Sequence, residues 1–227
     1  MVGFGNGLSA EDSHPGPLQM SVDLSQQIRA VLDSDSPVRN LPEVLTAIKL
    51  FVQQQQEATE WAGLDHLTDE LESIHKELHT SPANLEAFVS ILCALQPVLC
   101  PIYVITRWWD TVLRGALRDP TLSAKATQQA KALTLHALVP NSPKAADFRN
   151  GIIESYLDVY DESSGRDALE HAALHTEERR IQKLWKQNLR DITEEFCMKR
   201  PEVCALMRLI PNQEPTSRLF DRSSSPP

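Results

Sequence analysis

Apolar residues recur every three or four positions along most of this chain, with charged and polar residues between them. Spacing of this kind places the apolar side chains on one side of an α-helix, where they can pack against a neighbour. Period-two alternation is absent, and no Asn-Gly hairpin turn lies between apolar runs, so support for strands is thin. We therefore predict an all-α chain. The clearest helical spacing is that of Leu64, Leu67, Leu71, Ile74 and Leu78.

Proline marks several of the expected helix boundaries. Ser81-Pro82 and Ser142-Pro143 each combine a hydroxyl that can cap the first turn with a proline that suits the first helical position. Pro42 predicts a further start, and Asp119-Pro120 predicts an end. Short turns of this kind are typical of antiparallel neighbours, so we expect stacked antiparallel helices in a HEAT-like α-solenoid. The sequence shows no strict repeat period.

The helical part is expected between two segments of different composition. Residues 1–20 combine glycines with prolines and are predicted to be a disordered lead-in. Residues 211–227 end in a Ser/Pro run that is typical of a flexible tail. The helical, repeat-like domain therefore covers residues 21–210. Its eight or nine helices are expected at about residues 24–32, 42–56, 64–78, 82–99, 104–117, 122–138, 143–160, 176–196 and 201–210.

Charge and hydropathy narrow the class of partner. The chain of 227 residues has a formal net charge of -9 and contains no extended Lys/Arg run, so nucleic acid and anionic membranes are poor partners. No apolar run approaches the roughly 18–20 residues of a transmembrane helix. The first residues lack the basic and apolar regions of a secretory signal. We expect a cytoplasmic protein without a transmembrane segment.

The four cysteines form two pairs, Cys93 with Cys100 and Cys197 with Cys204, each with a spacing of seven residues. Two turns of one helix separate such residues by about 10 Å, which is too far for a disulfide within a pair. A zinc site of four cysteines usually has ligands two to four residues apart. A disulfide across the two pairs is the alternative, but nothing marks the chain as secreted, so we expect buried, reduced cysteines.

Two His-x3-His motifs are the best candidates for metal chemistry. His75 with His79, and His171 with His175, could each chelate zinc from one helix face. Neither motif has a glutamate beside a histidine in the positions that metallohydrolases use, so solvated faces are the simpler interpretation. A metal-dependent helical hydrolase remains the enzymatic alternative. We expect no catalytic residue, no metal and no cofactor.

Trp108 and Trp109 stand side by side before Asp110 on the expected helix. Neighbouring helical side chains point about 100° apart, so the two rings cannot share one direction. Trp108 is predicted to lie in the core, whereas Trp109 suits a core contact and a partner contact about equally. The candidate partner contact consists of Arg107, Trp109 and Asp110.

Several stretches resemble a known family. They are residues 88–99, residues 108–117 with the Trp-Trp-Asp sequence, residues 161–169, and the helix of Trp185 that leads to Arg200-Pro201. Together they resemble the N-terminal helical region of fungal hamartin, the tuberous sclerosis 1 protein, over about residues 24–220. The shared features are packing and turn patterns.

The resemblance implies a HEAT-like, non-catalytic scaffold. Hamartin stabilises tuberin, a GTPase-activating protein, and thereby restrains TOR signalling, in part at the vacuolar or lysosomal surface. Hamartin continues into further repeats and a C-terminal coiled coil that holds tuberin, so we expect this chain to match only its N-terminal part. Taken without the resemblance, the residues are also compatible with a generic helical adaptor for an unrelated protein partner.

Overall fold

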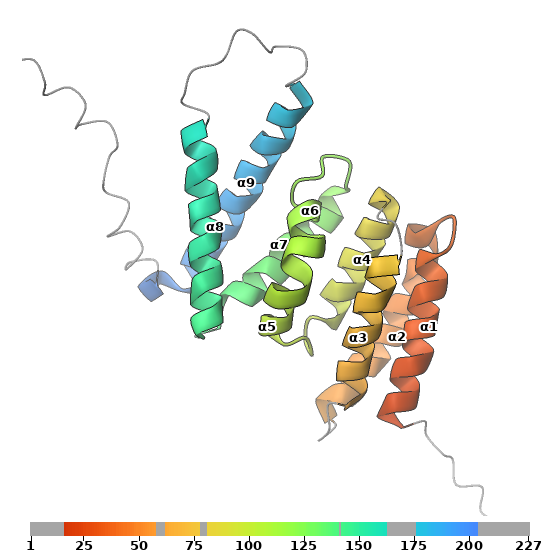
Figure 1. Cartoon of the computed structure of the whole chain (residues 1–227). Coiled ribbons are helices and arrows are strands. Elements are labelled where there is room, and N and C mark those ends of the chain that lie inside the picture. Colours follow the sequence, from red (N-terminus) through yellow and green to blue (C-terminus); the bar gives the residue numbers. More distant parts are fainter. Residues whose placement is uncertain (1–15, 58–61, 78–80, 141, 163–175, 204–227) are drawn as a thin grey trace, which may run out of the picture. The chain divides into compact units, whose positions relative to one another are not determined.

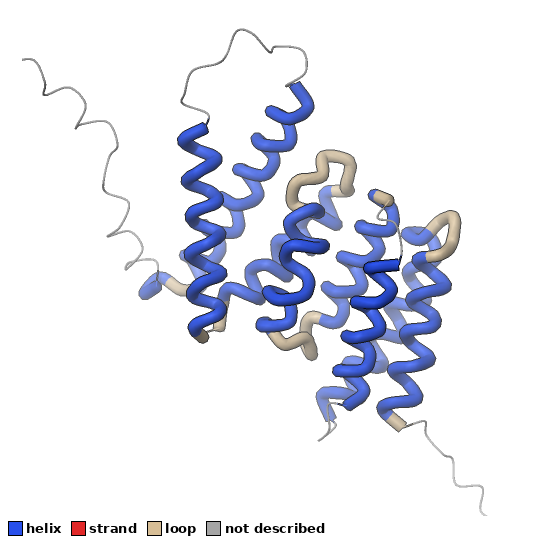
Figure 2. Tube along the Cα trace, in the orientation of Figure 1, coloured by secondary structure: helices blue, strands red, loops and turns tan. Residues whose placement is uncertain are grey.

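A computed structural model describes residues 16–57, 62–77, 81–140, 142–162 and 176–203. Every regular element within these ranges is a helix, as Figures 1 and 2 show, so the prediction of an all-α chain is confirmed. The chain forms two compact units. Unit 1 comprises residues 1–100 and 121–126, and unit 2 comprises residues 101–120 and 127–227.

Unit 1 contains four long helices. They are α1 (Pro17–Leu32), α2 (Pro37–Glu57), α3 (Ala62–Glu77) and α4 (Pro82–Leu95). Helix α1 packs against α2 and α3, and α2 packs against α4. The helices α1 and α3 therefore lie side by side, as do α2 and α4 (Figure 1).

The apolar stripes that the sequence predicted form the core of unit 1. Burying one large aliphatic side chain stabilises the fold by about 1.5–3 kcal/mol. Packing of these stripes therefore contributes more to stability than the modest helix propensities of the segments do. Of the predicted seam on α3, only Leu78 lies outside the described residues. The most deeply buried side chains of α1, α2 and α3 are Ile28, Ile48, Phe51, Leu67, Leu71 and Ile74.

Two helix starts differ from the prediction. Helix α1 begins at Pro17, inside the predicted lead-in, because a proline suits the first helical position. Helix α2 begins at Pro37, and Pro42 lies within it. An interior proline costs about 3 kcal/mol. The burial of Leu41, Val44 and other apolar residues of α2 offsets that cost.

Serine caps open α4 and α7 (Ala124–Leu138). The Ser81 hydroxyl accepts a hydrogen bond of 3.1 Å from the Asn84 amide, which confirms the predicted cap. Ser123 accepts one of 3.2 Å from the Ala126 amide. The Ser123 hydroxyl in turn donates 2.6 Å to the Glu86 carboxylate on α4, which ties the start of α7 to that helix.

Unit 2 contains a composite helix, the rest of α7, and two long helices. The composite helix is α5 (Pro101–Tyr103), the π-helix η1 (Val104–Leu113) and α6 (Arg114–Ala116). The long helices α8 (Pro143–Glu162) and α9 (Thr176–Lys199) pack against each other (Figure 1). The Ser142 hydroxyl caps α8 by accepting 3.2 Å from the Ala145 amide, as predicted.

Candidate functional site

The tryptophan segment is a π-helix rather than the predicted α-helix. A π-helix bonds each amide to the carbonyl five residues earlier and has about 4.4 residues per turn. The nine steps from Val104 to Leu113 then complete about two full turns, whereas in an α-helix they would leave the two residues on opposite sides. Both side chains are buried, at 2% and 0% exposure, which agrees with a winding that turns them to one face. π-Helical winding is rare in proteins overall, and where it occurs it is often at a functional site.

The two tryptophans take different positions. Trp108 is 1% exposed, which confirms the predicted core position. Trp109 is half-buried, and its ring meets Phe148 of α8 edge-on at a centroid distance of 4.9 Å. The same ring lies 6.1 Å from that of Trp185 on α9. Trp109 therefore packs within unit 2 and keeps only part of its surface exposed.

A cation covers Trp185, the second ring that Trp109 contacts. The Arg118 guanidinium lies 4.8 Å from the Trp185 ring centroid, where the ring quadrupole attracts it. Burial, and then the nearby charge of Arg114, lower the pKa of Arg118. Arginine remains charged at physiological pH despite such a shift. The contact joins the end of the composite helix to α9.

Arg107 and Asp110 lie toward the solvent side of η1. The Arg107 guanidinium is 4.9 Å from the Tyr103 ring, and the side chain is half-buried. The Asp110 carboxylate, 76% exposed, forms an ion pair of 3.5 Å with Arg114. Thr106 and Thr111 are exposed on the same helix. The Asp110 carboxylate is thus in solvent and Arg107 is half-buried, while Trp109 packs against α8 and α9.

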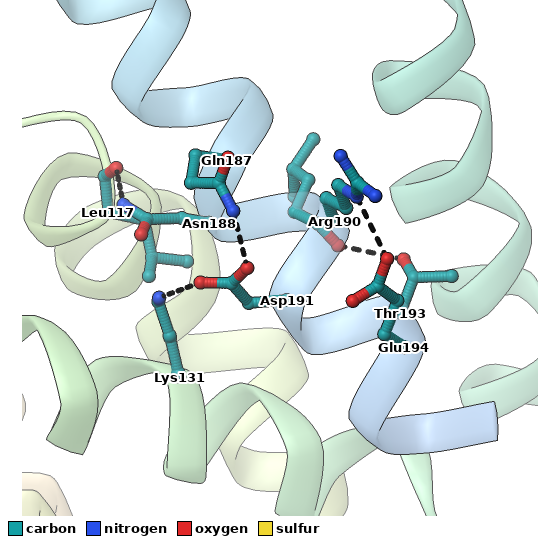
Figure 3. Close-up of polar contacts among 9 residues, drawn as sticks. Leu117, Lys131, Gln187, Asn188, Arg190, Asp191, Thr193 and Glu194 are labelled. Carbon is teal, nitrogen blue, oxygen red and sulfur yellow. Dashed lines mark hydrogen bonds and ion pairs between the residues drawn. The ribbon is translucent and has the colours of Figure 1, made fainter. Parts of the chain in front are cut away.

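Polar contacts join α9 to two other elements of unit 2, as Figure 3 shows. The buried Asn188 side chain donates 2.7 Å to the Leu117 carbonyl at the end of α6. One turn on, Asp191 accepts 2.5 Å from Lys131 of α7 and 2.7 Å from Gln187. If this buried carbonyl had no hydrogen-bond donor, the fold would be less stable by about 1–3 kcal/mol. The hydrogen bond from Asn188 therefore favours the observed contact between α9 and the composite helix.

The Asp191 pair is partly shielded from water, because the Lys131 side chain is 14% exposed. Burial by itself would raise the pKa of Asp191. The hydrogen bonds from Lys131 and Gln187 outweigh that effect and lower the pKa below its ordinary value. The pair therefore favours the ionised carboxylate and the folded state near neutral pH.

Two arginines close the end of α7. Arg149 donates to the carbonyls of Leu138 and Pro140, at 2.8 and 2.9 Å. Arg200 donates 2.8 Å to the carbonyl of Val139. The last carbonyls of a helix have no partner within it, so these cations supply both hydrogen bonds and a favourable charge.

The metal hypothesis finds no support among the described residues. They contain no group of three or more His, Cys, Asp or Glu side chains that could hold a metal ion. Of the two His-x3-His motifs they include only His75, whose ring packs on Phe88 at 5.1 Å. His79, His171 and His175 lie outside them.

The prediction of reduced, buried cysteines is wrong for Cys197, which is disulfide-bonded. The separation of about 10 Å applies only within a single helix, and α9 ends at Lys199. Cys93 and Cys100 are free, and Cys100 is exposed. Burial raises the pKa of the Cys93 thiol, which favours its neutral form.

The sequence pattern did not identify the polar residues that hold unit 2 together. Asn188 interrupts the buried side of α9, and that interruption was the available signal. Lys131 and Asp191 lie 60 positions apart in the chain, so no local pattern connects them.

None of the helices in the described part of the chain is long and apolar enough to span a membrane. Comparisons with protein-family models, with curated proteins and with solved structures found no match for this chain.

Proposed function

We propose that the chain is a non-catalytic scaffold of the hamartin type, whose helix pairs stack as in a HEAT-like α-solenoid. In this role it acts with a tuberin-type GTPase-activating protein to restrain TOR signalling. The specific assignment rests on the sequence resemblance of residues 88–99, 108–117 and 161–169, with the helix of Trp185.

The pairing of helices in unit 1 is the observation that carries the scaffold role. Helix α1 lies beside α3, and α2 lies beside α4. Successive helix pairs that stack in this way bury a continuous core and leave extended outer faces for partners. The same arrangement uses apolar side chains for packing and leaves most charged groups in solvent.

The solvent side of η1 is the proposed partner contact. It presents the guanidinium of Arg107 and the carboxylate of Asp110, and the exposed Thr106 and Thr111 lie on the same helix. These groups lie on a helix that Trp109 packs against α8 and α9 of unit 2. A rigidly held polar surface loses little conformational entropy on binding.

Affinity capture tests the proposal. The tagged chain is incubated with a fungal extract, and bound proteins are identified by mass spectrometry against a variant with scrambled surface residues. We expect enrichment of a tuberin-type protein together with TOR-pathway or vacuolar-surface proteins. If only an unrelated protein is enriched, the chain is a generic helical adaptor. If nothing is enriched over the control, the scaffold assignment fails.

A further inference from the structure

The disulfide of Cys197 lies near the C-terminal end of α9. The chain has four cysteines, of which Cys93 and Cys100 are free, so Cys204 is the remaining partner within the chain. Because α9 ends at Lys199, the spacing of two helical turns does not keep these two residues apart. A bond between them closes a short loop, and the first residue after α9 lies near the middle of that loop.

This residue, Arg200, joins two elements of unit 2. Its amide donates 2.8 Å to the Phe196 carbonyl in the last turn of α9, and its guanidinium donates 2.8 Å to the Val139 carbonyl just beyond α7. The Val203 amide in turn donates 3.1 Å to the Arg200 carbonyl. A cross-link that closes a loop removes conformations from its open state. The disulfide therefore favours the position in which Arg200 closes the end of α7.

The disulfide is accessible to a reductant. Cys197 is half-buried, and a pocket opens beside it, with Thr193, Glu194 and Met198 among the residues that line it. Reduction requires that a thiolate reaches one sulfur of the bond, so exposed disulfides are the labile and regulatory ones. In a reducing compartment a protein disulfide is usually transient and senses the redox state.

The packing of α9 lies away from the disulfide. Its buried side chains Trp185, Leu189 and Ile192 precede Cys197 by more than one helical turn. The hydrogen bond from Asn188 to the Leu117 carbonyl also lies in the preceding part of the helix. These contacts do not pass through the loop after α9, so they remain when the disulfide is reduced.

From these contacts we infer that Cys197 and Cys204 form a redox switch, whose disulfide holds Arg200 against the end of α7 and whose reduction releases it. The reductant is a dithiol, either a small molecule or a protein with two neighbouring thiols. One of its thiolates attacks a sulfur of the bridge, the S–S bond breaks, and a mixed disulfide forms. The second thiol then displaces the protein sulfur. The reductant leaves as a disulfide, and its two protons and two electrons remain on the two cysteine thiols.

Peptide mapping and hydrogen exchange of the full chain test this inference. Alkylation before and after reduction is expected to show Cys93 and Cys100 as thiols and Cys197 linked to Cys204. On addition of dithiothreitol, exchange at the Arg200 amide is expected to become at least about tenfold faster, because the loop can then open locally. Exchange in the last turn of α7 is expected to rise with it. Far-UV circular dichroism is expected to change little, because the helices remain folded.

Three variants separate the disulfide from its neighbours. C197S/C204S is expected to show the fast exchange without a reductant and to give no response to one. C93S/C100S keeps the disulfide and is the matched control, so it is expected to respond as the wild-type chain does. In Arg200→Ala the last turn of α7 is expected to exchange fast in both redox states, because the contact that carries the response is absent.

Unchanged exchange after reduction of the wild-type chain would overturn the inference. So would a peptide map that links Cys197 to a second copy of the chain, because the bond would then join two molecules. Loss of all helices of unit 2 on reduction would overturn it as well, since the disulfide would then stabilise the whole unit rather than one contact.

Discussion

Unit 1 and unit 2 are both helical, but different forces hold them together. In unit 1 the buried hydroxyls of Ser25 and Thr68 donate to carbonyls of their own helices. The buried Ser21 hydroxyl lies 3.0 Å from His66 Nδ1 of α3, and Ser123 bonds to Glu86, so a few polar contacts between elements accompany the aliphatic packing. In unit 2 a π-helix, an aromatic cluster and hydrogen bonds between elements add to the apolar core. The units therefore differ in which contacts are central to them: unit 2 has an aromatic cluster and a buried side-chain hydrogen bond to a carbonyl of another element, whereas unit 1 relies more on aliphatic stripes.

The largest effect is expected from removing the centre of the aromatic cluster in unit 2. Trp185 is 2% exposed and contacts Trp109 and Arg118. Trp185→Ala should lower the free energy of unfolding by about 3–5 kcal/mol, because a large cavity replaces the ring. Urea denaturation measures the change. Met198→Ala on the same helix, at a side chain 75% exposed, should stay within about 0.5 kcal/mol of wild type. Equal losses in the two variants would refute the aromatic core of unit 2.

The winding of η1 is tested at Leu113. The π-helix buries this side chain together with Val104, whereas an α-helix would turn it to the opposite side. Leu113→Ala should therefore cost about 2–5 kcal/mol in chemical denaturation. Thr111→Ala, at an exposed neighbour, is the matched control and should have little effect. A Leu113→Ala variant as stable as wild type would mean that the segment is wound as an ordinary α-helix.

A pair of polar substitutions sharpens the contrast between the units. In unit 2, Asn188→Ala leaves the Leu117 carbonyl without its partner and should cost about 1–3 kcal/mol. In unit 1, Thr68→Val removes a hydroxyl that bonds only to its own helix, at Leu64, and should cost less than about 1.5 kcal/mol. Thermal and urea unfolding of both variants measure the difference. If Thr68→Val proves the more damaging, the assignment of polar contacts to unit 2 is incorrect.

The smallest expected effect is a difference in acid sensitivity. The pKa of Asp191 is lower in the folded state than its unfolded value of about 3.9, so its pair with Lys131 stabilises the fold above that pH. This stabilisation is lost as the pH falls through the folded pKa. Asp191→Asn should therefore be less stable than wild type at pH 7, and the gap should narrow below about pH 4.

Glu77 of unit 1 provides the comparison for this pH profile. Its hydrogen bonds from Arg29 and Ser73 lower its pKa, so the sign of the pH dependence is the same. Both partners in the Arg29–Glu77 pair are exposed to solvent, and salt screens such a pair strongly. Glu77→Gln should change unfolding less than Asp191→Asn does, most clearly in high salt. A larger effect for Glu77→Gln would reverse the comparison.

Apolar spacing predicted unit 1 well because its helices are held by repeating stripes. The seam of Leu64, Leu67, Leu71 and Ile74 is buried as expected, and the cap at Ser81 is present. Pro42 misled the prediction of a helix start, since a sufficiently apolar helix tolerates an interior proline.

Unit 2 could be predicted only in part. The start of α8 at Pro143 and of α9 at Thr176 followed from capping and from apolar spacing. The π-helix did not, because a period of 3.6 residues was assumed for every helix. The contact of Asn188 with Leu117 joins residues 71 positions apart, which no local pattern encodes. At the candidate site, the sequence identified Trp108 as core but left the position of Trp109 open.

The most direct test of the proposed scaffold role compares one charge exchange in each unit. In R107E/D110R the charges on the solvent side of η1 are exchanged, and in R39E/E43R two exposed charges on α2 are exchanged. Neither variant alters the net charge. Binding of purified tuberin-type protein is measured by biolayer interferometry against the wild-type chain. We predict at least a tenfold loss of affinity for R107E/D110R and no loss for R39E/E43R. Absence of binding by the wild-type chain, or equal binding by all three proteins, would contradict the account.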